Sequence, residues 1–237
     1  MEKTIMFASG KGGSGTTTFT VNLGVILANT GAKVLVFDMN IGLRNDDIYL
    51  GMEDRILFDL GDVASGLCPL EKAVIAHDSC PNLYLLPCSQ CKGISGFSGR
   101  HIQTLLEKLR EDYDYVLVDC PVSIGKVMEY IAGRSDKAVL VVTPDYVSVR
   151  NTDAVSKRLE SIGMTDRCFA INKVTESVIG GELSLDWISE TMEIPLVGML
   201  SLDETIHQCN NRGVPAALDG SSYYVKTFIE IAARIIA

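Results

Sequence analysis

The sequence has no long apolar run, since no stretch approaches the ~20 consecutive apolar residues that a membrane-spanning helix requires. Its first residues, MEKTIMFASGKGG, hold an apolar run that is too short for a secretory leader. A disulfide framework is also not indicated, because the chain has 7 cysteines, an odd number. Together these absences predict a cytoplasmic protein.

Excess positive charge is missing as well. The 237 residues carry 21 Lys and Arg against 30 Asp and Glu, which gives a formal net charge of −9. This balance argues against a general nucleic-acid binder, because contacts with phosphate backbones need clustered Lys and Arg. The sequence contains no internal repeat, low-complexity segment or linker. We therefore expect one domain over residues 1–237.

What the sequence does contain is an alternation of short apolar runs and longer helical patterns. The apolar runs predict strands over residues 4–8, 33–38, 82–87, 113–119, 137–144, 168–173 and 194–200. The helical patterns cover the segment after residue 15 and residues 99–110, 147–162, 203–211 and 222–236. Strands that are apolar throughout are typical of a parallel sheet covered on both faces. We therefore predict an α/β fold with a doubly wound, mostly parallel sheet.

A glycine-rich segment, SGKGGSGTTTF, follows the first predicted strand. Gly10 and Gly15 have the spacing of the phosphate-binding loop G-x-x-x-x-G-K-[ST], but Thr16 occupies the lysine position. Together with Gly12 and Gly13, these glycines allow successive N–H groups to converge on an anion at a helix N-terminus. We expect a polyphosphate here, bound more weakly because a hydroxyl replaces an ammonium. The alternative is a turn that binds nothing.

Polar side chains follow the strands at the edge where such sheets bind ligands. Thr17 can offer its hydroxyl to Mg²⁺, and Thr18 can reach a phosphate oxygen. Asp119 and Asp38 each end an apolar strand, where a carboxylate commonly orients Mg²⁺ and its waters. Asn172 lies at the end of a later strand. The alternative is that the two aspartates only cap turns.

The segment SGKGGSGTT resembles the deviant Walker A motif, KGGxGK[ST], of the MinD/ParA family of P-loop ATPases, and most closely its MinD branch. The match continues in order through VFDMNIGLRNDDIYLG, NLYLLPCSQ, YDYVLVDCP, SVRNTDAV and PLVGMLSLDETI. The resemblance implies the P-loop NTPase fold, with ATP and Mg²⁺ as cofactors. It also implies a homodimer formed around the nucleotide and a protein partner, in spatial organisation such as division-site placement.

The resemblance assigns roles to individual residues. Lys11 would be the signature lysine, which reaches across the dimer interface to the partner's nucleotide, and Asn172 would face the adenine. Nucleotide binding is implied for Gly10, Lys11, Gly12, Gly13, Ser14, Gly15, Thr16, Thr17, Thr18, Asn172 and Lys173. Metal binding is implied for Thr17, Asp38 and Asp119. Catalysis is implied for Lys11, Asp38 and position 40.

The chain departs from the family pattern at the reaction centre. Thr16 replaces the lysine, Asn40 replaces the second aspartate of a D-x-D pattern, and Ser123 replaces a glycine. An amide cannot accept a proton as a carboxylate can. We therefore expect nucleotide binding with weak or no hydrolysis. The sequence leaves open whether Lys126, or Lys11 turned inward, compensates for the missing lysine.

The end of the chain also departs from the pattern. The family's MinD members carry a basic amphipathic helix that lies on the membrane, which requires a cationic face. Lys226 and Arg234 are the only cations in residues 223–237, so direct membrane contact is not expected. We expect Phe228, Ile231 and Ile235 to face the core of the fold instead.

Two other functions stay open. One is a nucleotide-independent scaffold that keeps only the fold. The other is a metal or iron–sulfur carrier that uses the CxxC pair Cys88 and Cys91, although one pair supplies two of the four ligands that a zinc site needs. Ordinary cysteines in a loop are the alternative. We interpret Asn45, Asp46 and Asp47 as an Asx turn or a helix cap rather than a carboxylate cluster.

Overall fold

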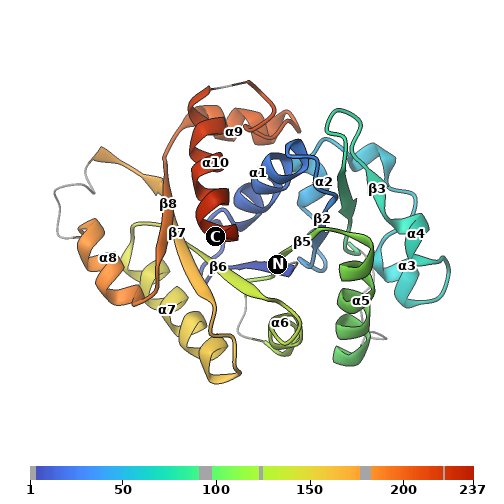
Figure 1. Ribbon diagram of the computed structural model, residues 1–237, viewed down its shortest axis with the longest axis horizontal. Coiled ribbons are helices and arrows are strands. Elements are labelled where there is room, and N and C mark those ends of the chain that lie inside the picture. Colours follow the sequence, from blue (N-terminus) through green and yellow to red (C-terminus); the bar gives the residue numbers. More distant parts are fainter. Residues whose placement is uncertain (1–3, 91–97, 123–124, 177–182, 221) are drawn as a thin grey trace.

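The computed structural model describes residues 4–90, 98–122, 125–176, 183–220 and 222–237 (Figure 1). Within them, an 8-stranded sheet has the order β3-β4-β2-β5-β1-β6-β7-β8. The strands are β1 Thr4–Ala8, β2 Val34–Asp38, β3 Ile75–Ala76, β4 Leu83–Leu86, β5 Tyr115–Asp119, β6 Lys137–Val142, β7 Arg167–Val174 and β8 Leu196–Ser201. Every neighbouring pair is parallel except β3 with β4. The predicted fold class is therefore confirmed.

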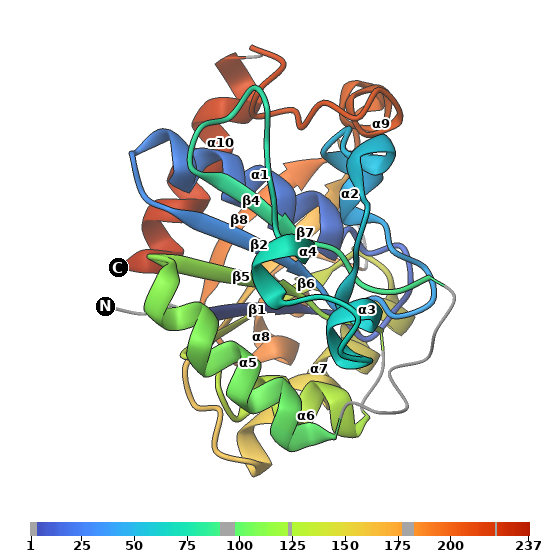
Figure 2. The ribbon, with the colours of Figure 1, turned by 90° about the vertical axis from the view of Figure 1, so that its right-hand side faces the viewer.

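Helices cover both faces of the sheet, as Figures 1 and 2 show. Helices α1 and α10 pack on one face with α9, and α5, α6, α7 and α8 pack on the other. Their bounds are α1 Thr16–Asn29, α5 Gly99–Asp112, α6 Lys126–Ala132, α7 Tyr146–Ser161, α8 Leu185–Met192, α9 Glu204–Asn211 and α10 Ser222–Ile236. The short helices are α2 Asp46–Tyr49, η1 Glu53–Arg55, α3 Leu60–Ala64 and α4 Leu70–Ala73.

Each central strand contributes to two cores. Successive side chains of a strand point to opposite faces of the sheet. In β1, Ile5 and Phe7 therefore pack in the core on the side of α1 and α10. Met6 and Ala8 pack in the core beneath α5, α6 and α7. This double burial explains why the strands are apolar at every position rather than at alternate ones.

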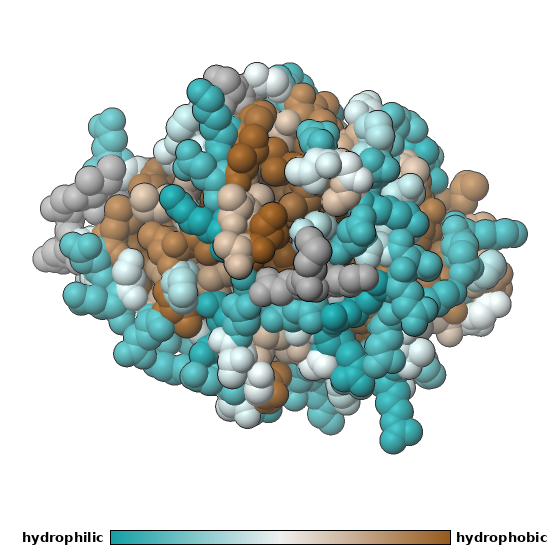
Figure 3. Space-filling model, viewed as in Figure 1, coloured by the Kyte–Doolittle hydropathy of each residue, from teal (hydrophilic) through white to brown (hydrophobic). Residues whose placement is uncertain are grey.

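The last helix, α10, belongs to the core, as predicted. Phe228, Ile231 and Ile235 are 0%, 1% and 2% exposed. The Phe228 ring meets the Phe19 ring of α1 edge to face, with 5.8 Å between the centroids. The outer side of α10 still exposes apolar side chains, among them Ile229, and Figure 3 shows an apolar area over this helix. No helix among the described residues combines the length and apolar content that crossing a bilayer requires.

Parallel pairing brings the ends of the central strands to one edge of the sheet. Residues Asp38 and Asp119 are direct register partners at the ends of β2 and β5. The glycine loop follows β1, which pairs with β5 on one side and with β6 on the other. Asn172 lies near the end of β7, beside β6. The residues that the sequence selects are therefore gathered by strand order rather than by closeness in the chain.

The Phe228→Ala substitution tests the packing between α10 and α1. We expect a loss of about 3–5 kcal/mol in the free energy of unfolding, because a fully buried ring leaves a cavity. Urea denaturation measures this loss. The neighbouring Ile229 is 49% exposed, so Ile229→Ala should change stability by about 0.5 kcal/mol or less. Equal losses for the two variants would contradict this packing.

Candidate functional site

The loop between β1 and α1 has a backbone that glycine favours. Gly13 and Gly15 have φ values of 75° and 100°, in the left-handed region. A Cβ on Gly10 would lie 2.2 Å from the backbone carbon of Asn151 in α7, so only glycine fits there. Gly15 is the N-cap of α1 and no side chain caps this helix. The first N–H groups of α1 therefore have no side-chain partner at the loop.

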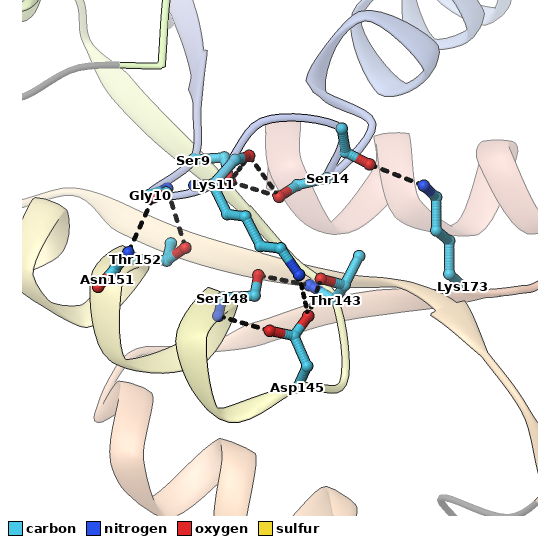
Figure 4. Close-up of polar contacts among 11 residues, drawn as sticks. Ser9, Gly10, Lys11, Ser14, Thr143, Asp145, Ser148, Asn151, Thr152 and Lys173 are labelled. Carbon is cyan, nitrogen blue, oxygen red and sulfur yellow. Dashed lines mark hydrogen bonds and ion pairs between the residues drawn. The ribbon is translucent and has the colours of Figure 1, made fainter.

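The loop is held together by its own side chains, as Figure 4 shows. The Ser9 hydroxyl donates to the Ser14 hydroxyl over 2.7 Å, and the Ser14 hydroxyl donates to the Lys11 carbonyl over 2.7 Å. The Gly10 N–H donates to the hydroxyl of Thr152 in α7 over 3.0 Å. Ser14 thus stabilises the curl of the loop from inside.

Lys11 points away from the glycine loop and toward α7 (Figure 4). Its Nζ lies 2.9 Å from Asp145 Oδ2. Asp145 is the N-cap of α7, where its carboxylate also accepts hydrogen bonds from the Thr143 hydroxyl and the Ser148 N–H. Partial burial opposes the shift, but these bonds and Lys11 hold the pKa of Asp145 below its ordinary value. Lys11 is therefore not turned inward.

A pocket of about 660 Å³ opens above the loop, which is within the usual size range for small-molecule sites. The predicted nucleotide-binding residues that line it are Gly12, Gly13, Gly15, Thr16, Thr17, Thr18, Asn172 and Lys173. Three others, Gly10, Lys11 and Ser14, belong to the loop but do not line the pocket, and they bind α7, Asp145 and the loop backbone. Sequence reasoning missed the opposite wall, which includes Tyr49, residues 201–204 and Asn210.

Asn172 and Asn210 contact the end of the glycine loop and the first turn of α1, respectively. The Asn172 amide donates to the Ser14 carbonyl over 2.8 Å, and the Asn210 amide donates to the Thr18 hydroxyl over 3.2 Å. Asn172 is the residue expected to face an adenine, and it lines the pocket while it binds the loop. Its neighbour Lys173 donates from Nζ to the Gly13 carbonyl over 2.7 Å.

The predicted metal-binding residues lie together beneath the loop. Asp119 is fully buried, and its Oδ2 accepts hydrogen bonds from the Thr17 hydroxyl at 2.6 Å and the Asn40 amide at 2.7 Å. Its Oδ1 has no hydrogen-bond partner among the described residues. Asp38 accepts the backbone N–H groups of Asn40 and Asn45, at 2.7 and 3.1 Å. Asp38 therefore holds the segment that follows β2.

A further carboxyl, Asp46, completes a buried acidic cluster that the sequence interpretation missed. Asn45 occupies the N-cap position of α2, as the cap interpretation expects, but its side chain makes no capping hydrogen bond. Asp46 is 0% exposed, and neither of its carboxyl oxygens accepts a hydrogen bond from a described residue. The run of acidic residues after β2 was the available signal, but its burial depends on how α2 packs against α1 and α9.

Burial and mutual repulsion raise the pKa values of the carboxyls in this cluster. Burial, followed by the charges of Asp38 and Asp119, raises the pKa of Asp46 well above its ordinary value. Burial and the charge of Asp38 also raise the pKa of Asp119 to about 7, although the hydroxyls of Thr17 and Thr16 oppose the shift. The contact between the two carboxyls raises the pKa of Asp46 and lowers that of Asp119. Of the two carboxyls, Asp46 is therefore the one whose environment more strongly favours the protonated form.

The structure around Cys88 gives little support to the hypothesis of a metal carrier. Cys88 is 0% exposed and its thiol donates to the Asn40 carbonyl over 3.1 Å. Burial and the nearby charge of Asp38 raise its pKa far above the ordinary value, whereas metals bind the thiolate. Cys91 and Ser123 lie outside the described residues. Within the described part of the chain, no three potential ligands of the His, Cys, Asp or Glu type gather as a metal site.

A glycine loop between β1 and a buried helix, in a mostly parallel sheet with carboxylates at the adjacent strand ends, defines the fold of the P-loop nucleoside triphosphatases. A protein family described as "AAA domain" matches residues 2–168. The septum site-determining protein MinD of Synechocystis is 34% identical over 221 residues, which are 92% of this chain and 83% of the relative. The chain therefore belongs to the MinD/ParA family of deviant Walker A ATPases.

Two solved structures are similar over almost the full chain. One is the MinC:MinD cell division protein complex of Aquifex aeolicus, with a TM-score of 0.90, 34% identity, and coverage of 99% of this chain and 96% of that one. The other is the septum site-determining protein MinD of Pyrococcus horikoshii complexed with Mg-ADP. It has a TM-score of 0.87, 27% identity, and coverage of 99% and 96%.

The raised pKa values of Asp46 and Asp119 predict a pH-dependent stability. The native state retains protons that the unfolded chain releases above pH 3.8, the ordinary pKa of an aspartate. The free energy of unfolding should therefore fall as the pH rises through about 7. Asp46→Asn should make this fall shallower and stabilise the protein at pH 8 by about 1–3 kcal/mol, because a neutral donor replaces a buried acid.

Urea titrations at pH 5 to 8 measure this dependence. Asp54→Asn, which changes an exposed acid in η1, serves as the matched control and should follow the wild type. An Asp46→Asn profile parallel to that of the wild type would show that Asp46 does not hold the proton.

Proposed function

We propose that this protein is an ATP-binding switch of the MinD type that dimerises around its nucleotide, docks to a protein partner and acts in division-site placement. The observation that carries the proposal is the pocket of about 660 Å³ whose floor is formed by residues of the glycine loop and the first turn of α1. The related proteins are septum site-determining proteins, and the Aquifex relative was solved as a MinC:MinD complex. We therefore propose a protein partner similar to the MinC of that complex.

Nucleotide binding would rest mainly on backbone groups. The curled loop and the N-terminus of α1 present N–H groups and the positive end of the helix dipole to an anion. The donor set beneath the loop also fits Mg²⁺, which prefers oxygen ligands. It comprises the Thr17 hydroxyl and Asp119, whose Oδ1 is unpartnered among the described residues. Mg²⁺ would neutralise phosphate charge there, while Asp38 holds the adjoining segment in place.

Dimerisation would require Lys11 to leave Asp145. Their side chains are 43% and 36% exposed, so the ion pair contributes no more than about 0.2–1 kcal/mol. A polyphosphate bound to a second copy carries more negative charge than one carboxylate, and hydrogen bonds between ionised groups are the stronger ones. The pair is thus weak enough for Lys11 to exchange one partner for the other.

Slow hydrolysis follows from the chemistry at positions 40 and 16. The Asn40 amide donates a hydrogen bond to Asp119, and it offers no carboxylate to accept a proton from an attacking water. Thr16 presents a neutral hydroxyl where the common loop presents an ammonium. We therefore propose a switch that remains in its nucleotide-bound state for longer than an ATPase with both groups.

Two measurements test the proposed switch, namely the melting temperature and the molecular mass in solution, each with and without ATP and Mg²⁺. ATP with Mg²⁺ should raise the melting temperature, since ligand at 100 times its Kd stabilises the native state by about 2.7 kcal/mol. ATP should also convert monomer to dimer. Lys11→Ala should keep the thermal shift and remain monomeric. No thermal shift for the wild type would contradict nucleotide binding and leave the nucleotide-independent scaffold as the function.

Hydrolysis is tested by restoring both altered groups. The Thr16→Lys and Asn40→Asp double variant should hydrolyse ATP at least about tenfold faster than the wild type, the scale of one positioned proton-transfer or charged group. The ammonium at position 16 also offsets the carboxylate added beside Asp119. Phosphate release measures the rate, with the two single variants as controls. A wild type as fast as the double variant would contradict slow hydrolysis.

A further inference from the structure

We propose that Lys173 supplies, from the end of β7, the positive charge that the glycine loop lacks at position 16, and that it binds the polyphosphate of the nucleotide. This inference rests on the proposed function, because it presupposes a nucleotide in the pocket. It answers a question that the sequence leaves open, namely which cation compensates for Thr16.

The charges around the pocket single out Lys173. It is the only Lys or Arg among the described residues that line the pocket, whose other ionisable lining residues are Tyr49, Asp203, Glu204 and His207. Lys11 is paired with Asp145. Lys126 begins α6 and is not among the lining residues. Without Lys173, the described residues that line the pocket would include two carboxylates and no lysine or arginine, although the ligand itself carries several negative charges.

The ammonium already lies on the phosphate loop. The Lys173 Nζ donates to the carbonyl oxygen of Gly13 over 2.7 Å, and Gly13 lines the pocket. An ammonium has three N–H donors, so this bond leaves two for an anion. Asn172 binds the next carbonyl, that of Ser14, over 2.8 Å. Two consecutive residues of β7 thus contact two consecutive residues of the loop.

The backbone of β7 turns this side chain toward the loop. Lys173 has a φ of 59°, a left-handed conformation that side chains other than glycine, Asn and Asp rarely adopt. The pairing of β7 with β8 shifts register between Ile171 and Val174, as at a β-bulge. Bulges beside binding sites re-aim side chains, and strained backbone gathers at ligand contacts. The backbone irregularity at Lys173 therefore orients its side chain toward the glycine loop.

The ammonium of Lys173 favours ligands that carry phosphate groups. Lysine binds phosphate as a compact charge, so its contribution grows with the number of phosphate groups. Lys173 should matter for ATP and ADP and have little effect on adenosine. A lysine that instead packed against the base would affect all three ligands alike.

A double-mutant cycle between Lys173→Gln and Thr16→Lys tests the inference. Glutamine keeps a donor for the Gly13 carbonyl but loses the charge. We expect Lys173→Gln to weaken binding of ATP with Mg²⁺ on the order of tenfold in the wild-type background. In the Thr16→Lys background the same change should cost less than about threefold, because the loop then has its own ammonium. Calorimetric titration measures each Kd.

Three further measurements complete the experiment. Lys173→Arg should retain ATP binding, Lys126→Gln should leave it unchanged, and adenosine binding should not respond to Lys173→Gln. Melting temperatures without nucleotide establish that each variant folds. An equal loss in both backgrounds, or an equal loss for ATP and adenosine, would overturn the role of Lys173 while the proposed function stands. A wild type that binds no ATP would overturn both.

Discussion

The glycine loop depends on main-chain hydrogen bonds from two elements that lie far away in the sequence. Thr152 of α7 accepts from the N–H of Gly10, and Asn172 and Lys173 of β7 donate to the carbonyls of Ser14 and Gly13. Each contact uses a backbone group, so the curl does not depend on the side chain at position 16. The nest of N–H groups can therefore survive the replacement of its usual lysine.

The carboxylates beneath the loop impose a second constraint. Asp38, Asp46 and Asp119 are all fully buried, and each is balanced in a different way. Backbone N–H groups donate to Asp38, a hydroxyl and an amide donate to Asp119, and burial raises the pKa of Asp46. The amide of Asn40 belongs to this arrangement, because a carboxylate there would face Asp119 beside another acid. The slow hydrolysis proposed above and the crowded acidic cluster would thus have a common physical basis.

The fold was predictable because its signal is local and redundant. Seven apolar runs each predict a strand, and the strand ends observed lie within two residues of the expected ones. The patterns do not predict β3, the helices between residues 46 and 73, or α6 and α8, which have two to eight residues each. Elements that short carry no periodicity, and packing against larger elements decides them.

The sequence by itself determined the α/β fold, the glycine loop and the sheet edge along which Asp38, Asp119 and Asn172 lie, because residue type and strand order suffice for these. Only the tertiary structure decided the direction of each cation and the state of each acid. Lys11 lies on Asp145, Lys173 lies on the loop, and Asp46 is buried beside Asp119. Those outcomes depend on distances between residues that are far apart in the chain, and charges respond to distance and burial rather than to residue type.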